Sequence, residues 1–125
     1  VLITADTLVY LGDELLGKPK DREDACGILR RLSGRTHSVL TGVVLRTGDA
    51  VTPFTDTTGV TFKSLFEEEI AYYVDTYRPY DKAGAYGVQE WIGYAGITGI
   101  EGSYFNVMGL PVQRLYDELR TFLDC

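Results

Sequence analysis

A helical segment that lies between stretches rich in β-branched residues constrains the fold of this chain most strongly. Its apolar side chains recur at helical spacing, at Ala25, Ile28, Leu29 and Leu32. Asp21 stands where a side-chain oxygen caps the first turn of a helix. Gly34 stands where a residue in the left-handed conformation ends one. We therefore expect a helix between these two residues that covers a sheet.

Three stretches have the β-branched content of strands, at residues 1–10, 37–46 and 57–62. Gly12-Asp13 offers a turn from the first stretch into residues 14–16, which predicts a hairpin. We expect a Gly48-Asp49 turn and a connection containing Pro53 between the other two stretches. Strands and helices thus alternate in an α/β order.

The second half of the chain continues this order. Ser64-Leu65-Phe66-Glu67 has the pattern of a capping box and predicts a helix to about Tyr77. A short strand is expected over residues 96–101. Pro111 suits the first position of a last amphipathic helix, which is expected to run through Leu115, Leu119 and Leu123. Together these elements predict one α/β domain over residues 1–125.

The length, net charge and cysteine content of the chain argue against several classes of protein. The chain has 125 residues, of which 45% are hydrophobic, enough to bury the core of one domain. A formal net charge of -6 argues against a protein that binds a nucleic acid polymer, although it allows a single nucleotide. No apolar run approaches the roughly 18 residues of a membrane span. Cys26 and Cys125 lack the spacing of a disulfide or metal site, which favours a reducing cytoplasm.

The stretch from Asp81 to Gln89 fits the period of neither a helix nor a strand. It combines a charged pair, two spaced glycines and a terminal amide, in the order Asp-Lys-Ala-Gly-Ala-Tyr-Gly-Val-Gln. Such a composition predicts a binding loop. A second segment, Ala5-Asp6-Thr7 followed by Gly17-Lys18-Pro19, again places a carboxylate and a lysine at the ends of short apolar runs. Together the two segments suggest a site for a phosphate ester.

The charged residues of these segments suit phosphate chemistry. Asp6 could hold a divalent cation such as Mg²⁺ or orient a water, or it could simply form a turn or cap a helix. Lys18 and Lys82 each lie beside glycine or alanine and could neutralise charge on phosphate oxygens. The alternative for both lysines is a solvated loop position, which is the commonest environment of lysine.

Two further polar residues carry weaker signals. Gln89 has a donor and an acceptor in one plane, which is what recognition of a pyrimidine base needs, although a solvent-facing glutamine is the alternative. His37 is the only histidine, and no serine or cysteine nucleophile motif accompanies it. We expect His37 to form a structural hydrogen bond rather than to act as a general base. Trp91 follows the loop and is left open as a wall of the site or a dimer contact.

Five blocks of sequence, in this order, resemble the Maf family of nucleoside triphosphate pyrophosphatases. The blocks are Ile3-Thr4-Ala5-Asp6-Thr7, Leu16-Gly17-Lys18-Pro19, Leu32-Ser33-Gly34-Arg35-Thr36-His37, the loop from Asp81 to Gln89, and Gly102-Ser103-Tyr104 with Gly109-Leu110-Pro111. The resemblance implies a mixed twisted sheet with flanking helices. Members of the family begin with a segment of the type Ser-x-Ser-x-Arg-Arg. We therefore expect this chain to lack the family's N-terminal strand and helix, together with a second acidic metal ligand.

The resemblance also implies a reaction and roles for residues. Such an enzyme splits the bond between the α and β phosphates of a nucleoside triphosphate with Mg²⁺ or Mn²⁺. The catalytic residues would be Asp6, Lys18 and Lys82, and Asp6 would also bind the metal ion. Thr7 and Gln89 match the branch that acts on dTTP and UTP, with modified pyrimidine nucleotides as further candidates.

Two alternatives stay open at this point. One is a nucleotide-binding or regulatory module without turnover. The other is a fragment that folds only in a paired dimer, since residues 1–3 would form a hydrophobic strand without a neighbour. A homodimer is also allowed for the enzyme, with no partner nucleic acid or membrane.

Overall fold

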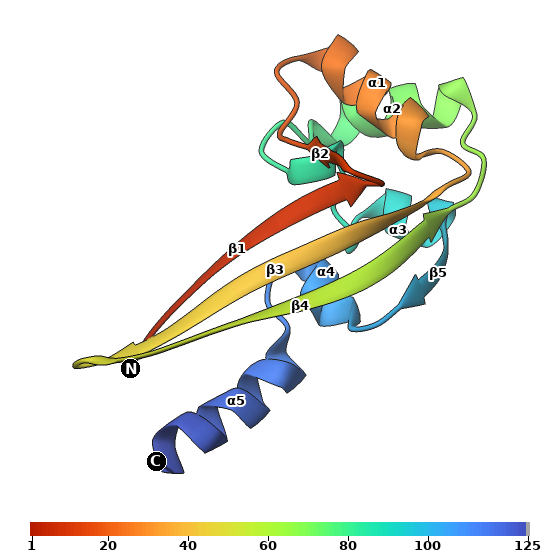
Figure 1. The fold of residues 1–125 in the computed structure, drawn as a ribbon. Helices are drawn as coiled ribbons and strands as arrows, with labels where there is room; N and C mark the ends of the chain where they lie inside the picture. The colour runs from red at the N-terminus through yellow and green to blue at the C-terminus, as the bar shows by residue number, and fades with distance from the viewer. Residues whose placement is uncertain (125) are drawn as a thin grey trace.

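The structure of the protein, a computed structural model, describes residues 1–124 and contains a five-stranded sheet with helices packed against it (Figure 1). The strands are β1 (Leu2–Leu11), β2 (Glu14–Leu16), β3 (Thr36–Thr47), β4 (Ala50–Phe62) and β5 (Ile97–Glu101). The helices are α1 (Arg22–Leu32), α2 (Glu67–Tyr77), α3 (Trp91–Gly96), α4 (Tyr104–Met108) and α5 (Val112–Asp124), with a 3₁₀ turn η1 (Ala83–Ala85). The predicted α/β class with flanking helices is confirmed.

The sheet has the strand order β2-β1-β3-β4-β5, and each pair of neighbours is antiparallel. The predicted hairpin of β1 and β2 is confirmed, with Leu11 opposite Glu14 across the turn. β3 and β4 form a second, much longer hairpin that runs diagonally through the molecule (Figure 1). Two-residue turns that contain Gly12 and Gly48, both at positive φ, close the hairpins.

The expected irregular connection at Pro53 was wrong, because β4 already begins at Ala50 and Pro53 pairs with Val44 of β3. β5 lies beside β4 only at residues 59–62, so Pro53 sits on a stretch of β4 with a neighbour on one side alone. A proline is tolerated on such an edge, since its missing N–H removes no hydrogen bond from the ladder when it faces away from the partner strand.

The helix from Asp21 is confirmed. The Asp21 carboxylate accepts a hydrogen bond from the backbone N–H of Asp24 at 2.9 Å, and Gly34 follows the helix at a φ of 68°. These contacts are the N-cap and the left-handed ending that the sequence predicts.

The predicted capping box at Ser64 was wrong. α2 begins at Glu67, and the N–H of Phe66 donates to the carboxylate of Glu69 at 2.9 Å. The segment before it is tied to the end of α1, because the N–H of Leu65 donates to the Ser33 hydroxyl at 2.6 Å. That contact keeps residues 63–65 out of the helix.

The helices pack on one face of the sheet, where they enclose two hydrophobic clusters. Val9, Val39 and Val60 share this face by register and lie in the larger cluster with α1, α2 and the loop after α2. The smaller cluster joins Val43, Leu45 and Phe54 of the long hairpin to Leu115 of α5. The predicted last helix through Leu115, Leu119 and Leu123 is confirmed as α5, although the Leu123 side chain near its end is exposed.

α3 and α4 were not predicted, because helices of five or six residues carry too little periodicity to be recognised. α4 lies between the two clusters and is anchored by Asn106, which is fully buried. The Asn106 amide donates to the backbone oxygens of Val39 and Asp56, both at 3.1 Å. This anchor places the end of α4 beside β1. None of the helices in residues 1–124 is long and apolar enough to cross a bilayer.

Candidate functional site

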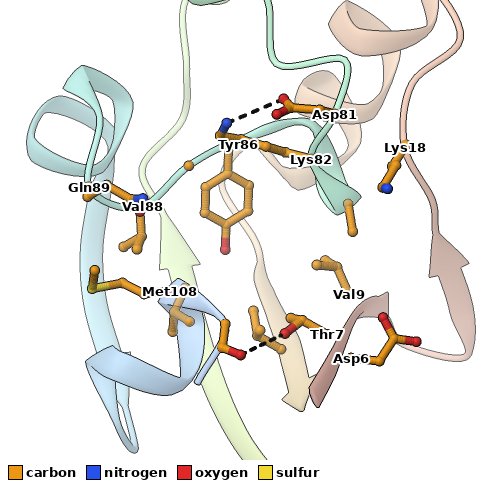
Figure 2. Close-up of a pocket in the computed structure, with 15 residues that line it drawn as sticks. Asp6, Thr7, Val9, Lys18, Asp81, Lys82, Tyr86, Val88, Gln89 and Met108 are labelled. Carbon is orange, nitrogen blue, oxygen red and sulfur yellow. Dashed lines mark hydrogen bonds and ion pairs between the residues drawn. The ribbon is translucent and has the colours of Figure 1, made fainter. Parts of the chain in front are cut away.

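A single cavity of about 300 Å³ gathers all five residues that the sequence predicts for the site. Its walls are formed by β1, the segment after β2, the loop after α2 and the end of α4 (Figure 2). Asp6, Thr7, Lys18, Lys82 and Gln89 line it. The structure therefore brings together side chains that are far apart in the sequence.

Gly84 joins these segments. Its backbone N–H donates to the carbonyl oxygen of Gly17 at 3.2 Å, which connects the loop that carries Lys82 to the segment that carries Lys18. Gly84 has a φ of 74°, and a Cβ atom there would lie 3.0 Å from Cγ1 of Val9. Only a residue without a side chain allows this backbone conformation together with such a close approach to β1.

The two ends of the cavity differ in chemistry (Figure 2). Asp6 and Lys18 lie at one side of it. Val88, Gln89 and Met108 lie at the opposite side. A ligand that fills the cavity would meet charged groups at one end and an apolar surface with one amide at the other.

Asp81 is a cavity residue that was not among the predicted site residues, although it opens the predicted loop. Its carboxylate lies 3.4 Å from the ammonium of Lys82. The Asp81 side chain is 79% exposed and that of Lys82 is 30% exposed, so the pair is largely solvated. Lys82 therefore faces the cavity without a buried ionic partner.

Asp6 and Asp81 are the carboxylates that line the cavity in the described part of the chain. Residues 1–124 contain no group of three or more histidine, cysteine, aspartate or glutamate side chains placed to hold a metal ion. Mg²⁺ commonly uses one or two protein carboxylates and completes its shell with water and substrate phosphates. The donor atoms present suit a cation of that kind.

Thr7 makes its contacts within the protein. Its hydroxyl donates to that of Thr41 at 3.0 Å and lies 3.5 Å from the carbonyl oxygen of Gly109. The Thr41 hydroxyl donates in turn to the carbonyl oxygen of Asn106 at 3.3 Å. This chain of hydroxyl groups fixes β1 against the end of α4.

Gln89 is exposed, and within residues 1–124 its side chain makes no hydrogen bond. It is therefore available to a ligand. Trp91, which the sequence leaves open, does not line the cavity and instead packs edge-on against Tyr72, with ring centroids 4.9 Å apart. Met108 was missed because α4 was not predicted; the neighbouring Gly109 was the available signal, as part of the last family block.

His37 is buried behind the cavity wall. Its Nε2 atom lies 2.5 Å from the hydroxyl of Tyr86, a residue that lines the cavity. Burial lowers the pKa of His37 to about 4, so the ring is neutral at physiological pH. The prediction of a structural hydrogen bond is confirmed, and His37 supports the wall through Tyr86.

The sequence of this chain matches that of a known protein family. The family model described as Maf-like protein matches residues 1–122, and the chain belongs to this family. A dTTP/UTP pyrophosphatase of Phocaeicola vulgatus is 58% identical over 120 residues, which cover 96% of this chain and 62% of that protein.

Other relatives agree. A dTTP/UTP pyrophosphatase of Porphyromonas gingivalis strain W83 is 57% identical over 122 residues, which are 98% of this chain and 61% of the relative. A dTTP/UTP pyrophosphatase of Flavobacterium johnsoniae is 50% identical over 123 residues, which are 98% of this chain and 63% of the relative. The chain thus spans less than two thirds of the length of these relatives.

Substitution of Gly84 tests how the loop is seated. Gly84→Ala should reduce the free energy of unfolding by about 3 kcal/mol, because it adds left-handed strain to a clash with Val9. Gly48→Ala is the matched control, since Gly48 also has a positive φ but open space around it, and it should cost only about 1 kcal/mol. Urea unfolding of both variants measures the difference. Equal losses would show that the approach to Val9 is not tight.

The buried His37 predicts a pH dependence of stability. Its folded pKa of about 4 lies below the ordinary value of 6.5, so the unfolded chain binds the proton more readily. The contribution is complete above about pH 6.5 and is lost as the pH falls, by about 2 kcal/mol between about pH 7 and pH 4.5. In His37→Phe this part of the pH dependence should disappear. Urea unfolding at several pH values measures it, and an unchanged slope would contradict the assignment.

Proposed function

We propose that this protein is a nucleoside triphosphate pyrophosphatase that hydrolyses dTTP and UTP. Water would be added across the bond between the α and β phosphates, and the products would be the nucleoside monophosphate and pyrophosphate. The observation that carries this proposal is the convergence of Asp6, Lys18, Lys82 and Gln89 on one cavity. Relatives at 50–58% identity that are named dTTP/UTP pyrophosphatase support it.

The charged end of the cavity suits the triphosphate. Lys18 lies at this end, and Lys82 lines the same cavity from the loop that the hydrogen bond between Gly84 and Gly17 joins to the segment of Lys18. They would stabilise the negative charge that builds on the phosphate oxygens as the bond breaks. Asp6 would orient the attacking water and accept its proton.

Asp6 would also hold a divalent cation, Mg²⁺ or Mn²⁺, that enters with the triphosphate. Asp81, the other carboxylate on the cavity wall, lies near enough to Lys82 to balance its charge before the nucleotide binds. A bound divalent cation supplies positive charge to the phosphate oxygens.

The opposite end of the cavity suits the base. Gln89 offers an N–H donor and an oxygen acceptor in one plane, which match the carbonyl and ring N–H of uracil or thymine. Val88 and Met108 provide apolar surface beside it. Thr7 would contribute indirectly, because its hydroxyl fixes β1 to the end of α4. A base that left Gln89 unpaired would bind less well. Modified pyrimidine nucleotides are further candidate substrates.

Other features of the protein stay predictions. We expect residues 1–125 to form one Maf-like domain, and a homodimer and a cytoplasmic location are further predictions. A module that binds nucleotides without turnover is the alternative to the enzyme, and an assay of products separates the two.

Loss of the Asp6 carboxylate should abolish most of the activity. Asp6→Asn keeps the size of the side chain but removes its negative charge, and we expect kcat to fall by about 100-fold or more. The measurement is release of pyrophosphate from dTTP or UTP with Mg²⁺. Asp49→Asn, in the turn of the long hairpin and outside the cavity, is the control and should leave kcat unchanged. Full turnover of Asp6→Asn would contradict its role, and orthophosphate as the only product would contradict the bond assignment.

Removal of the cavity lysines should weaken catalysis separately. Lys18→Ala and Lys82→Ala are each expected to lower kcat/KM by about 10- to 100-fold, because each removes one positive charge that stabilises the negative charge developing on the phosphate oxygens. Lys20→Ala is a matched control for Lys18→Ala, since Lys20 is exposed in the same segment and lies outside the cavity. Steady-state kinetics with dTTP measure the effect. The charge assignment fails if Lys18→Ala behaves like Lys20→Ala.

A further inference from the structure

A buried tyrosine hydroxyl holds the loop of the cavity from behind. Tyr73 lies on α2, its side chain is fully buried, and it does not line the cavity. Its hydroxyl donates to a carboxylate oxygen of Glu90 at 2.5 Å and accepts from the backbone N–H of Gly87 at 2.9 Å. One side chain of the core thus contacts the loop at two points.

These two points enclose Gln89. The N–H of Glu90 also donates to the carbonyl oxygen of Gly87 at 3.1 Å, which closes a turn over residues 87–90. Tyr73 of α2 thus binds the backbone of Gly87 on one side of Gln89 and the side chain of Glu90 on the other. The exposed Gln89 side chain remains free at the tip of this turn.

Lys82 lies against the same turn. A Cβ atom on Gly87 would be 2.8 Å from an oxygen of Glu90 and 2.8 Å from Cε of Lys82. The carboxylate and the lysine side chain therefore both lie over the bare α-carbon of Gly87. A shift of Gly87 or Glu90 would change the space in which the Lys82 side chain lies.

The direction of the hydrogen bonds is fixed by protonation. Burial, and then the hydrogen bond to Glu90, raise the pKa of the Tyr73 hydroxyl well above its ordinary value of 10. The hydroxyl therefore keeps its proton at neutral pH, donates to Glu90 and accepts from Gly87.

We infer that Tyr73 and Glu90 are positioning residues for catalysis, which hold the turn of residues 87–90 so that Lys82 faces the phosphates and Gln89 faces the base. This pair of residues is called the Tyr73–Glu90 clamp. The expected effect of the clamp on kinetics rests on the proposed function. The geometry of the clamp rests on the hydrogen bonds alone.

Tyr73→Phe tests the clamp, because it removes only the hydroxyl and keeps the buried ring. We expect kcat/KM for dTTP to fall about tenfold, mainly through kcat, since the loss of a well-placed hydrogen bond is worth roughly this factor. Tyr77→Phe is the matched control. Tyr77 stacks on Tyr73 from the same helix, with ring centroids 5.1 Å apart, and its hydroxyl makes no hydrogen bond within residues 1–124. It should leave both constants unchanged.

Substitutions of Glu90 separate positioning from simple destabilisation. Glu90→Gln keeps an oxygen that accepts from Tyr73 and should retain activity within about threefold, whereas Glu90→Ala should lose about tenfold. In a Lys82→Ala background, Tyr73→Phe should cost much less than in the wild-type protein, because the two residues act through one another. Equal effects of Tyr73→Phe in the two backgrounds would overturn the inference.

Trp91 gives a measurement that does not need turnover. It is the only tryptophan and directly follows Glu90, so its fluorescence reports on the turn. Tyr73→Phe should shift the emission, and Tyr77→Phe should not. Unchanged emission in Tyr73→Phe would overturn the clamp even if the wild-type protein hydrolyses dTTP. A wild-type protein that hydrolyses neither dTTP nor UTP, with the emission shift present, would contradict the proposed function and leave the clamp supported.

Discussion

The close seating of Gly84 on β1 is the contact on which the site depends. It sets the loop after α2 against Val9, and its N–H binds the segment that carries Lys18. Asp6 lies on the same strand as Val9, so this one contact relates the carboxylate to both lysines. A side chain at this position would separate the loop from the strand and open the cavity.

The positive charge in the cavity comes from two lysines, and the ion pair that one of them makes within the protein is weak. The chain as a whole is acidic, with a net charge of -6, yet two lysines face one small volume. Lys82 is paired with a largely exposed Asp81, and such solvated pairs are worth at most about 1 kcal/mol. A phosphate group can therefore replace the carboxylate as the partner of Lys82 at little cost. The overall sign of the surface says little about the ligand of this site.

The elements that could be predicted from the sequence are those fixed by local rules. The helix after Asp21 has both its caps and its apolar spacing in the sequence, and the first hairpin has its turn. Pro53 could not be placed in a strand from the sequence. A strand accepts a proline there only because β4 has a neighbouring strand on one side alone at this point. The start of α2 could not be placed because Ser33, distant in sequence, holds Leu65. For the site, residue types suggested Asp6, the two lysines and Gln89, and the family resemblance added Thr7, whereas the wall supplied by α4 depends on buried contacts of Asn106.

The cavity is held from two sides by polar groups that make hydrogen bonds within the protein. On one side, Thr7 and Thr41 connect β1 to α4 through hydroxyl groups, and Asn106 fixes α4 to the sheet. On the other side, Tyr73 fixes the turn of residues 87–90 to α2. Buried hydrogen bonds of this kind are costly to break, since an unpaired group in the core loses its solvation without compensation. These hydrogen bonds position the walls without a ligand, which reduces the entropy that binding would otherwise cost.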